Sequence, residues 1–154
     1  QLIELIDFKH MSDMITKEQG LALLKAKRPG WEARVAEMRA EGYPAYTTSA
    51  GWLGYPEDKI RALCREYLQL GHRYFKMKVG SADVEDDMMR ARAIRQEIGE
   101  SNFLMMDANQ KWDVPEAIVN MKKLAVFKPL WIEEPTNCDD IVGHREIAAA
   151  LRPL

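Results

Sequence analysis

Two lysines, Lys76 and Lys78, alternate with apolar residues in the segment 73–79. Because side chains of a strand alternate between its two faces, both ammonium groups share one face. Each then lowers the pKa of the other, since a like charge disfavours the charged form. Enzymes lower a lysine pKa to about 7–8 in this way to make a general base. The pattern therefore predicts a lysine base, and an edge strand with a solvated polar face is the alternative.

Carboxylates follow two later apolar runs. Asp107 and Asn109 come after one run, and Glu133 and Glu134 come after the other. Two adjacent strand residues cannot both point inward, so only one of the two glutamates is expected to face a site. Ordinary turn residues after a strand are the alternative for Asp107 and Asn109. A solvated charge pair is the alternative for the glutamates.

The spacing of these groups predicts that they meet. Asp107 lies 29 residues after Lys78, and Glu133 lies 26 residues after Asp107. One unit of an eight-stranded α/β barrel takes about 31 residues. A lysine and two carboxylates would then stand at the ends of successive strands. Mg²⁺ prefers oxygen ligands, and a metal beside a lysine base is suited to removing a proton α to a carboxylate.

Short β-prone runs alternate with helical patterns after Gly42. This alternation predicts an α/β chain with a parallel sheet. It fits the first four βα units of a modified (β/α)8 TIM barrel or an open doubly wound sheet. Four units cannot close an eight-stranded barrel, so the chain is either half of one or associates to complete one. Strands are expected at 45–48, 73–79, 103–106 and 130–132, with helices starting at Pro56, Asp83, Asp113 and Asp139 or Asp140.

The first 42 residues are expected to be helical. Thr16 and Gln19 have the spacing of a capping box, and the segment 28–30 ends that helix. A second short amphipathic helix ends at Gly42. The chain begins at Gln1 without a basic leader segment, and we expect it to be an internal segment of a longer protein.

Three motifs resemble the enolase superfamily in its mandelate racemase subgroup. They are Lys76-Met77-Lys78, Met106-Asp107-Ala108-Asn109 and Trp131-Ile132-Glu133-Glu134-Pro135. Longer segments at 42–49, 51–55 and 105–110 resemble the L-fuconate dehydratases within that subgroup. The resemblance implies that residues 1–42 are the helical end of an N-terminal capping region with its link. Residues 43–154 would be the first, incomplete half of the barrel.

The resemblance also implies roles for particular residues. Asp107 and Glu133 would be two Mg²⁺ ligands, and Lys78 would be the acid/base at the α-carbon of the substrate. Lys76 would contact the substrate carboxylate and lower the pKa of Lys78, and Asn109 would lie near the substrate. A third carboxylate ligand and a His–Asp pair would follow on later strands, outside this chain. The three histidines present do not match that motif: His10, His72 and His144.

The expected function is that of a fragment of a Mg²⁺-dependent sugar-acid dehydratase acting on L-fuconate or a similar aldonate. Such an enzyme removes the α-proton and expels the β-hydroxyl, and the product is a 2-keto-3-deoxy sugar acid. The isolated chain is expected to be inactive, because part of the site is missing. A non-catalytic half-barrel that binds a partner is the alternative, and a Schiff-base aldolase that uses Lys78 is a weaker one.

Composition excludes several classes of protein. The 154 residues carry a net charge of -2 without a basic run, which argues against nucleic-acid binding. The apolar runs are too short for a membrane span. The two cysteines, Cys64 and Cys138, are expected to be reduced thiols. We expect an intracellular protein, cytoplasmic or mitochondrial, that forms a homo-oligomer when intact.

Overall fold

The computed structural model describes Leu5, residues 14–43 and residues 45–152. The chain divides into two compact units, Gln1–Pro44 and Ala45–Leu154. The expected origin of residues 1–42 in a capping region stays a prediction. The predictions for residues 1–4 and 6–13, which include His10, lie outside the described residues.

The first unit holds two helices, α2 (Lys17–Ala26) and α3 (Trp31–Glu41). The predicted capping box begins α2: the Gln19 amide donates to the Thr16 hydroxyl at 3.2 Å, and the Thr16 amide donates to the Gln19 side chain at 2.8 Å. Gly42 ends α3, as predicted. No residue of α3 is buried, and its Trp31 and Met38 side chains are each 50% exposed.

The second unit alternates strands with helices, as predicted. Its elements are β1 (Thr47–Gly51), α4 (Glu57–Gln69), β2 (Tyr74–Lys78), α5 (Val84–Ile98), β3 (Phe103–Asp107), α6 (Val114–Leu124), the 3-10 helix η2 (Ala125–Phe127), β4 (Pro129–Glu133) and α7 (Ile141–Leu151). Side-chain caps at Asp83, Asp113 and Asp140 begin α5, α6 and α7. The first strand was misplaced, since it runs from 47 to 51 and not from 45 to 48.

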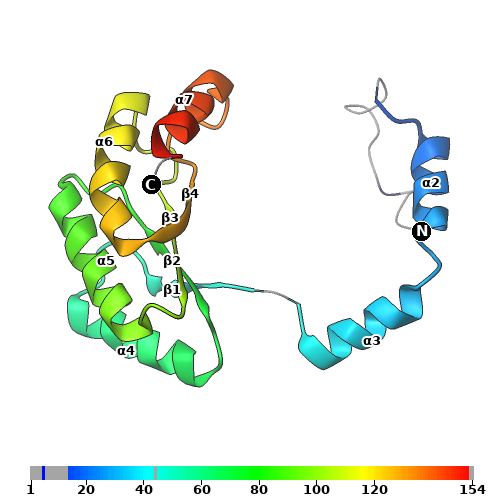
Figure 1. The fold of residues 1–154 in the computed structure, drawn as a ribbon, viewed down its shortest axis with the longest axis horizontal. Helices are drawn as coiled ribbons and strands as arrows, with labels where there is room; N and C mark the ends of the chain where they lie inside the picture. Colours follow the sequence, from blue (N-terminus) through cyan, green and yellow to red (C-terminus); the bar gives the residue numbers. More distant parts are fainter. Residues whose placement is uncertain (1–4, 6–13, 44, 153–154) are drawn as a thin grey trace. The chain divides into compact units, whose positions relative to one another are not determined.

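The four strands are parallel and stand in chain order, β1-β2-β3-β4. A doubly wound sheet reverses its strand order at a switch point and carries helices on both faces. Here the order does not reverse, and α4, α5 and α6 lie on the same side of the sheet (Figure 1). This arrangement is that of successive units of a (β/α)8 barrel, one of the two predicted architectures.

The two faces of the sheet differ in chemistry. The helix-covered face forms the hydrophobic core, with Phe75, Met77, Leu104 and Met106 all at 1% exposure or less. The opposite face carries the residues that alternate with them, so both predicted lysines lie there. The solvated-edge alternative for Lys76 is wrong, because β2 is an interior strand and this side chain is 6% exposed.

Gly51 allows β1 to approach β2 closely. A Cβ added at Gly51 would lie 2.5 Å from the Met77 Cα, a distance that no other residue type tolerates. The register between β1 and β2 shifts along the same stretch, between Thr47 and Gly51. The close approach brings the residues that follow β1 next to the lysine-bearing end of β2.

Both cysteines are free thiols, as predicted. Cys64 is fully buried in the core, and burial raises the pKa of its thiol to about 12. Cys138 is exposed. Among the described residues, no helix combines the length and the apolar character needed to cross a bilayer.

Candidate active site

The carboxyl ends of three neighbouring strands bring the predicted site residues together. Lys78 on β2 is the register partner of Asp107 on β3, and Asp107 is in turn the partner of Glu133 on β4. In parallel strands, register partners share a face of the sheet. Three side chains far apart in sequence therefore lie side by side, at the sheet end where α/β folds place their sites.

Ion pairs join four charged groups at this end. The Lys76 ammonium lies between two carboxylates, 3.0 Å from Asp107 Oδ2 and 2.8 Å from Glu133 Oε2. The Lys78 ammonium lies 2.6 Å from the same Asp107 oxygen. The Asp107 side chain is only 2% exposed, whereas that of Glu133 is 38% exposed. The cluster therefore extends from the sheet interior towards solvent.

Backbone hydrogen bonds fix the relative positions of the three strand ends along the strand direction. The Val79 amide donates to the Asp107 carbonyl at 2.9 Å, and the Ala108 amide donates to the Glu133 carbonyl at 3.0 Å. The Asn109 amide donates to Asp107 Oδ1 at 3.0 Å. Because Oδ2 receives both lysines and Oδ1 receives an amide, the Asp107 carboxylate is held in one orientation.

The carboxylates reverse the direction of the pKa shift expected for Lys76. Burial alone would lower its pKa, but hydrogen bonds to Glu133 and Asp107 outweigh burial and raise the pKa above its usual value. The like charge of Lys78, taken alone, predicted a lowered pKa instead. Burial would raise the pKa of Asp107, yet the hydrogen bonds from Lys78 and Lys76 lower it. In the metal-free protein both groups are therefore held in their charged forms.

These shifts predict how stability depends on pH in the metal-free protein. A carboxylate with a lowered pKa in the folded state stabilises the fold fully above its unfolded pKa, about 3.9. We therefore expect the difference in unfolding free energy between wild type and Asp107→Asn to be constant from about pH 5 to pH 8. It should shrink as the pH falls below about 4, through the lowered pKa of Asp107. Urea unfolding with a chelator present measures it, and a difference that grows in acid would contradict the assignment.

The two adjacent glutamates point in different directions, as predicted. Glu133 faces Lys76, whereas Glu134 has a left-handed backbone (φ 45°) and accepts from the Asn109 side-chain amide at 3.3 Å. Asn109 thus donates a hydrogen bond to Glu134 through its side chain and another to Asp107 through its backbone amide. Its predicted contact with substrate stays a prediction.

Comparison with known proteins identifies the family. Residues 59–153 match the model of the enolase C-terminal domain-like family. The chain belongs to the enolase C-terminal domain-like family. The match covers well over half of the chain and includes all four site residues. The enolase-superfamily resemblance of the three strand-end motifs is thereby confirmed.

The similarity to enolase-superfamily proteins covers nearly the whole chain. Human mitochondrial enolase superfamily member 1 is 54% identical over 153 residues, which are 99% of this chain and 34% of that protein. The L-galactonate dehydratase of Hypocrea jecorina is 49% identical over 156 residues, again 99% of this chain and 34% of that protein. The chain therefore spans about a third of the length of these relatives.

Solved structures agree with the enolase-type fold. The crystal structure of the human protein superposes with a TM-score of 0.88 at 53% identity, over 99% of this chain and 34% of that one. The L-talarate/galactarate dehydratase of Salmonella typhimurium, solved with Mg and L-lyxarohydroxamate, superposes with a TM-score of 0.66 at 40% identity. That match covers 69% of this chain and 27% of the other. The predicted α/β architecture, four units of an enolase-type barrel, is confirmed.

Aromatic side chains that the sequence analysis did not single out also line this enolase-type site. The Lys76 ammonium donates to the Tyr46 hydroxyl at 3.4 Å, and it lies 5.0 Å from the centre of that ring. The Lys78 ammonium lies 5.7 Å from the centre of the Trp52 ring. Both aromatic residues fall in segments that carried the family resemblance, but their types alone indicate no reaction.

The donor set of this candidate site fits part of a Mg²⁺ site. Asp107 and Glu133 direct carboxylate oxygens at one point, where a cationic group, the Lys76 ammonium, already lies. Mg²⁺ sites commonly use one or two carboxylates and complete the shell with water or substrate oxygens. Within the described part of the chain, no group of three or more His, Cys, Asp or Glu side chains is placed to hold a metal.

Proposed function

We propose that this chain forms part of the active site of a Mg²⁺-dependent sugar-acid dehydratase. The observation that carries the proposal is the convergence of two lysines and two carboxylates at the ends of three adjacent parallel strands. Two relatives named as dehydratases, of L-galactonate and of L-talarate/galactarate, support the reaction class. The activity would belong to a protein that carries these residues together with the remainder of the barrel.

Each charged group has a distinct proposed role. Asp107 and Glu133 are the two metal ligands that this chain supplies. When bound there, Mg²⁺ supplies positive charge that stabilises negative charge on the substrate and disfavours protonation of the neighbouring lysines. Lys76 binds the substrate carboxylate, because its ammonium already pairs with two carboxylates at this position.

Lys78 carries the proton transfer. Its neutral amine takes the α-proton of the sugar acid, and the electron pair of that C–H bond forms the new carbon–carbon double bond. The β-hydroxyl leaves with a proton from an acid outside this chain, as water. The resulting enol gains a proton at carbon and becomes the 2-keto-3-deoxy acid, so that the net change is loss of one water.

L-fuconate, or a similar aldonate, is our proposed substrate. The segments at 42–49, 51–55 and 105–110 support it, because they are the stretches that resemble the L-fuconate dehydratases. Two of these segments contribute Tyr46 and Trp52, which lie against the two site lysines. Residues that resemble this group of enzymes are thus the ones near the proposed reaction centre.

We also propose an intracellular site of action. Four vertebrate relatives, 49–54% identical to this chain, carry a mitochondrial name. The two free thiols are compatible with a reducing compartment.

A substrate panel tests the proposed function. The longest natural protein that contains these residues is incubated with L-fuconate, L-galactonate and galactarate, and 2-keto-3-deoxy products are quantified. We expect turnover that requires Mg²⁺ and stops on chelation, with L-fuconate preferred, and no turnover by residues 1–154 alone. A folded, Mg²⁺-loaded protein that dehydrates none of these acids would contradict the proposal. Borohydride trapping of a keto acid on Lys78 would instead indicate the aldolase alternative.

A further inference from the structure

A buried charged cluster lies beneath the end of β2. We propose that Asp87 of α5 is a positioning residue that holds the carboxyl end of β2, and through it Lys78, in register with Asp107. The inference rests on the proposed function, since it concerns the geometry of the same site. Asp87 itself is fully buried, and its hydrogen bonds go to Gly80, Ser81 and Arg90.

The Asp87 carboxylate binds the segment that follows β2. Its Oδ2 accepts from the Gly80 amide at 2.8 Å and from the Ser81 amide at 3.1 Å. Its Oδ1 accepts from the Ser81 hydroxyl at 2.7 Å. Three hydrogen bonds from two consecutive residues fix that segment, which begins two residues after Lys78. The backbone at the end of β2 therefore has one preferred path.

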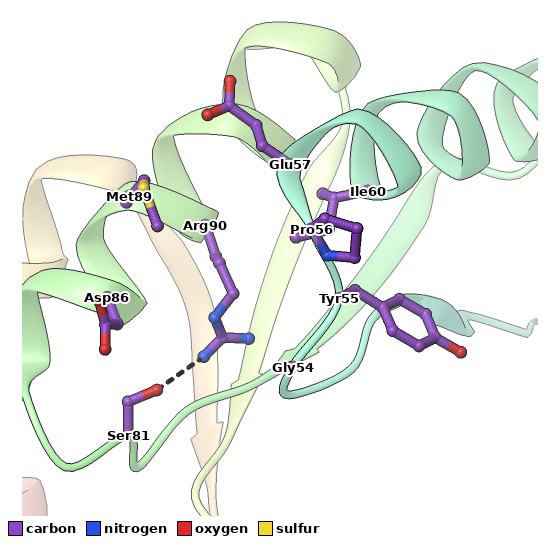
Figure 2. Close-up of a pocket in the computed structure, with 9 residues that line it drawn as sticks. All are labelled: Gly54, Tyr55, Pro56, Glu57, Ile60, Ser81, Asp86, Met89 and Arg90. Carbon is purple, nitrogen blue, oxygen red and sulfur yellow. Dashed lines mark hydrogen bonds between the residues drawn. The ribbon is translucent and has the colours of Figure 1, made fainter.

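Stability alone does not explain this arrangement. Arg90, 6% exposed, donates through Nη2 to Asp87 and to the Ser81 hydroxyl, the second contact being visible in Figure 2. Its buried Nη1 has no hydrogen-bond partner among the described residues. Burying an ion pair costs solvation free energy, and an unpaired donor adds to that cost. A buried ion pair is thus weak evidence for a stabilising role, whereas the hydrogen bonds of Asp87 to Gly80 and Ser81 are evidence for a positioning role.

The position of the segment at Gly80 and Ser81 affects the positions of Lys78 and Asp107. Gly80 has φ +99°, and a Cβ added there would lie 2.9 Å from Lys111 Cγ, so the segment packs tightly on the loop after β3. One residue earlier, the Val79 amide donates to the Asp107 carbonyl at 2.9 Å. If Gly80 moved, both contacts would change. Asp87 thus controls the spacing between Lys78 and Asp107.

Neighbouring carboxylates provide a matched test. Asp87→Asn and Asp86→Asn remove the same charge one residue apart, but Asp86 is exposed and Asp87 is buried. Mg²⁺ affinity of residues 1–154 is measured by calorimetry and expressed per folded molecule. We expect Asp87→Asn to weaken binding about tenfold, as when a group that orients a metal site is removed, because a shift of the segment after β2 would also shift Asp107. Asp86→Asn should change it less than about twofold. Equal affinities in the two variants would overturn the inference.

Amide spectra separate positioning from general destabilisation. In ¹H–¹⁵N spectra of Asp87→Asn, we expect the amides of Lys78, Val79 and Asp107 to shift, while those of α7 do not. Shifts spread evenly over the fold would indicate a merely structural role and overturn the inference. Should Asp87→Asn fail to fold, Ser81→Ala, which removes only the hydroxyl contacts, must show the same local pattern. If wild type binds no Mg²⁺, the proposed metal site fails, and these spectra still test the positioning.

Discussion

Replacing Lys78 with alanine is expected to lower kcat about 10²- to 10⁴-fold, the contribution typical of a positioned general base. The measurement uses the longest natural protein that contains these residues, with Mg²⁺ and the best substrate of the panel. The physical reason is position, since the Lys78 ammonium stands 2.6 Å from the Asp107 oxygen proposed to bind the metal. A substrate held at that metal would present its α-proton within reach of Lys78. KM should change little, because Lys76 keeps its contact with the substrate carboxylate.

An exposed lysine supplies the control for this variant. Lys122→Ala removes the same side chain from the surface of α6, where Lys122 is exposed. Its kcat should remain within about twofold of wild type. A Lys78→Ala protein that keeps more than about a tenth of wild-type kcat would show that another group takes the proton.

Replacing Asp107 with asparagine is expected to destabilise the metal-free second unit by about 3–5 kcal/mol at neutral pH. Asp107 is the shared partner of two ammonium groups, and Lys76 is 6% exposed. Without it, two positive charges face one remaining carboxylate, Glu133, in a poorly solvated place. Removal of one partner from a buried ion pair leaves an uncompensated charge, which is why the cost is large. Urea unfolding monitored by circular dichroism gives the value.

An exposed aspartate is the matched control for that variant. Asp58→Asn on α4 removes one carboxylate without a buried partner and should change the unfolding free energy by less than about 0.5 kcal/mol. An Asp107→Asn protein as stable as wild type would mean that the two lysines find other partners at no cost. The electrostatic description of the cluster would then be wrong.

Much of the site could be predicted because it depends on local patterns. Period-two alternation placed Lys76 and Lys78 on one face, and strand length placed Asp107 and Glu133 at strand ends. Side-chain caps are equally local, so Asp83 and Asp113 marked the starts of their helices. The adjacency of Glu133 and Glu134 was enough to predict that they diverge.

Long-range contacts account for what could not be predicted. The raised pKa of Lys76 depends on Glu133, a partner 57 residues away. Asp87 lies in an acidic first turn of a helix, where a carboxylate is usually solvated, and only the fold shows that it is buried under Gly80. The 3-10 helix η2 was not predicted, because no sequence pattern distinguishes it from the end of α6, which it follows directly.

A titration of two variants at adjacent glutamates tests whether Asp107 and Glu133 form a Mg²⁺ site. Residues 1–154 are titrated with Mg²⁺ as wild type, Glu133→Gln and Glu134→Gln. The two variants change charge equally, but Glu133 contacts Lys76 while Glu134 contacts Asn109.

We predict saturable binding by wild type, at least about tenfold weaker binding by Glu133→Gln, and wild-type binding by Glu134→Gln. Equal loss in both variants would show that Mg²⁺ responds only to net charge and not to this site. Absence of Mg²⁺ binding, together with association of the chain that increases with concentration, would contradict the proposed Mg²⁺ site. It would favour a non-catalytic half-barrel that binds a partner.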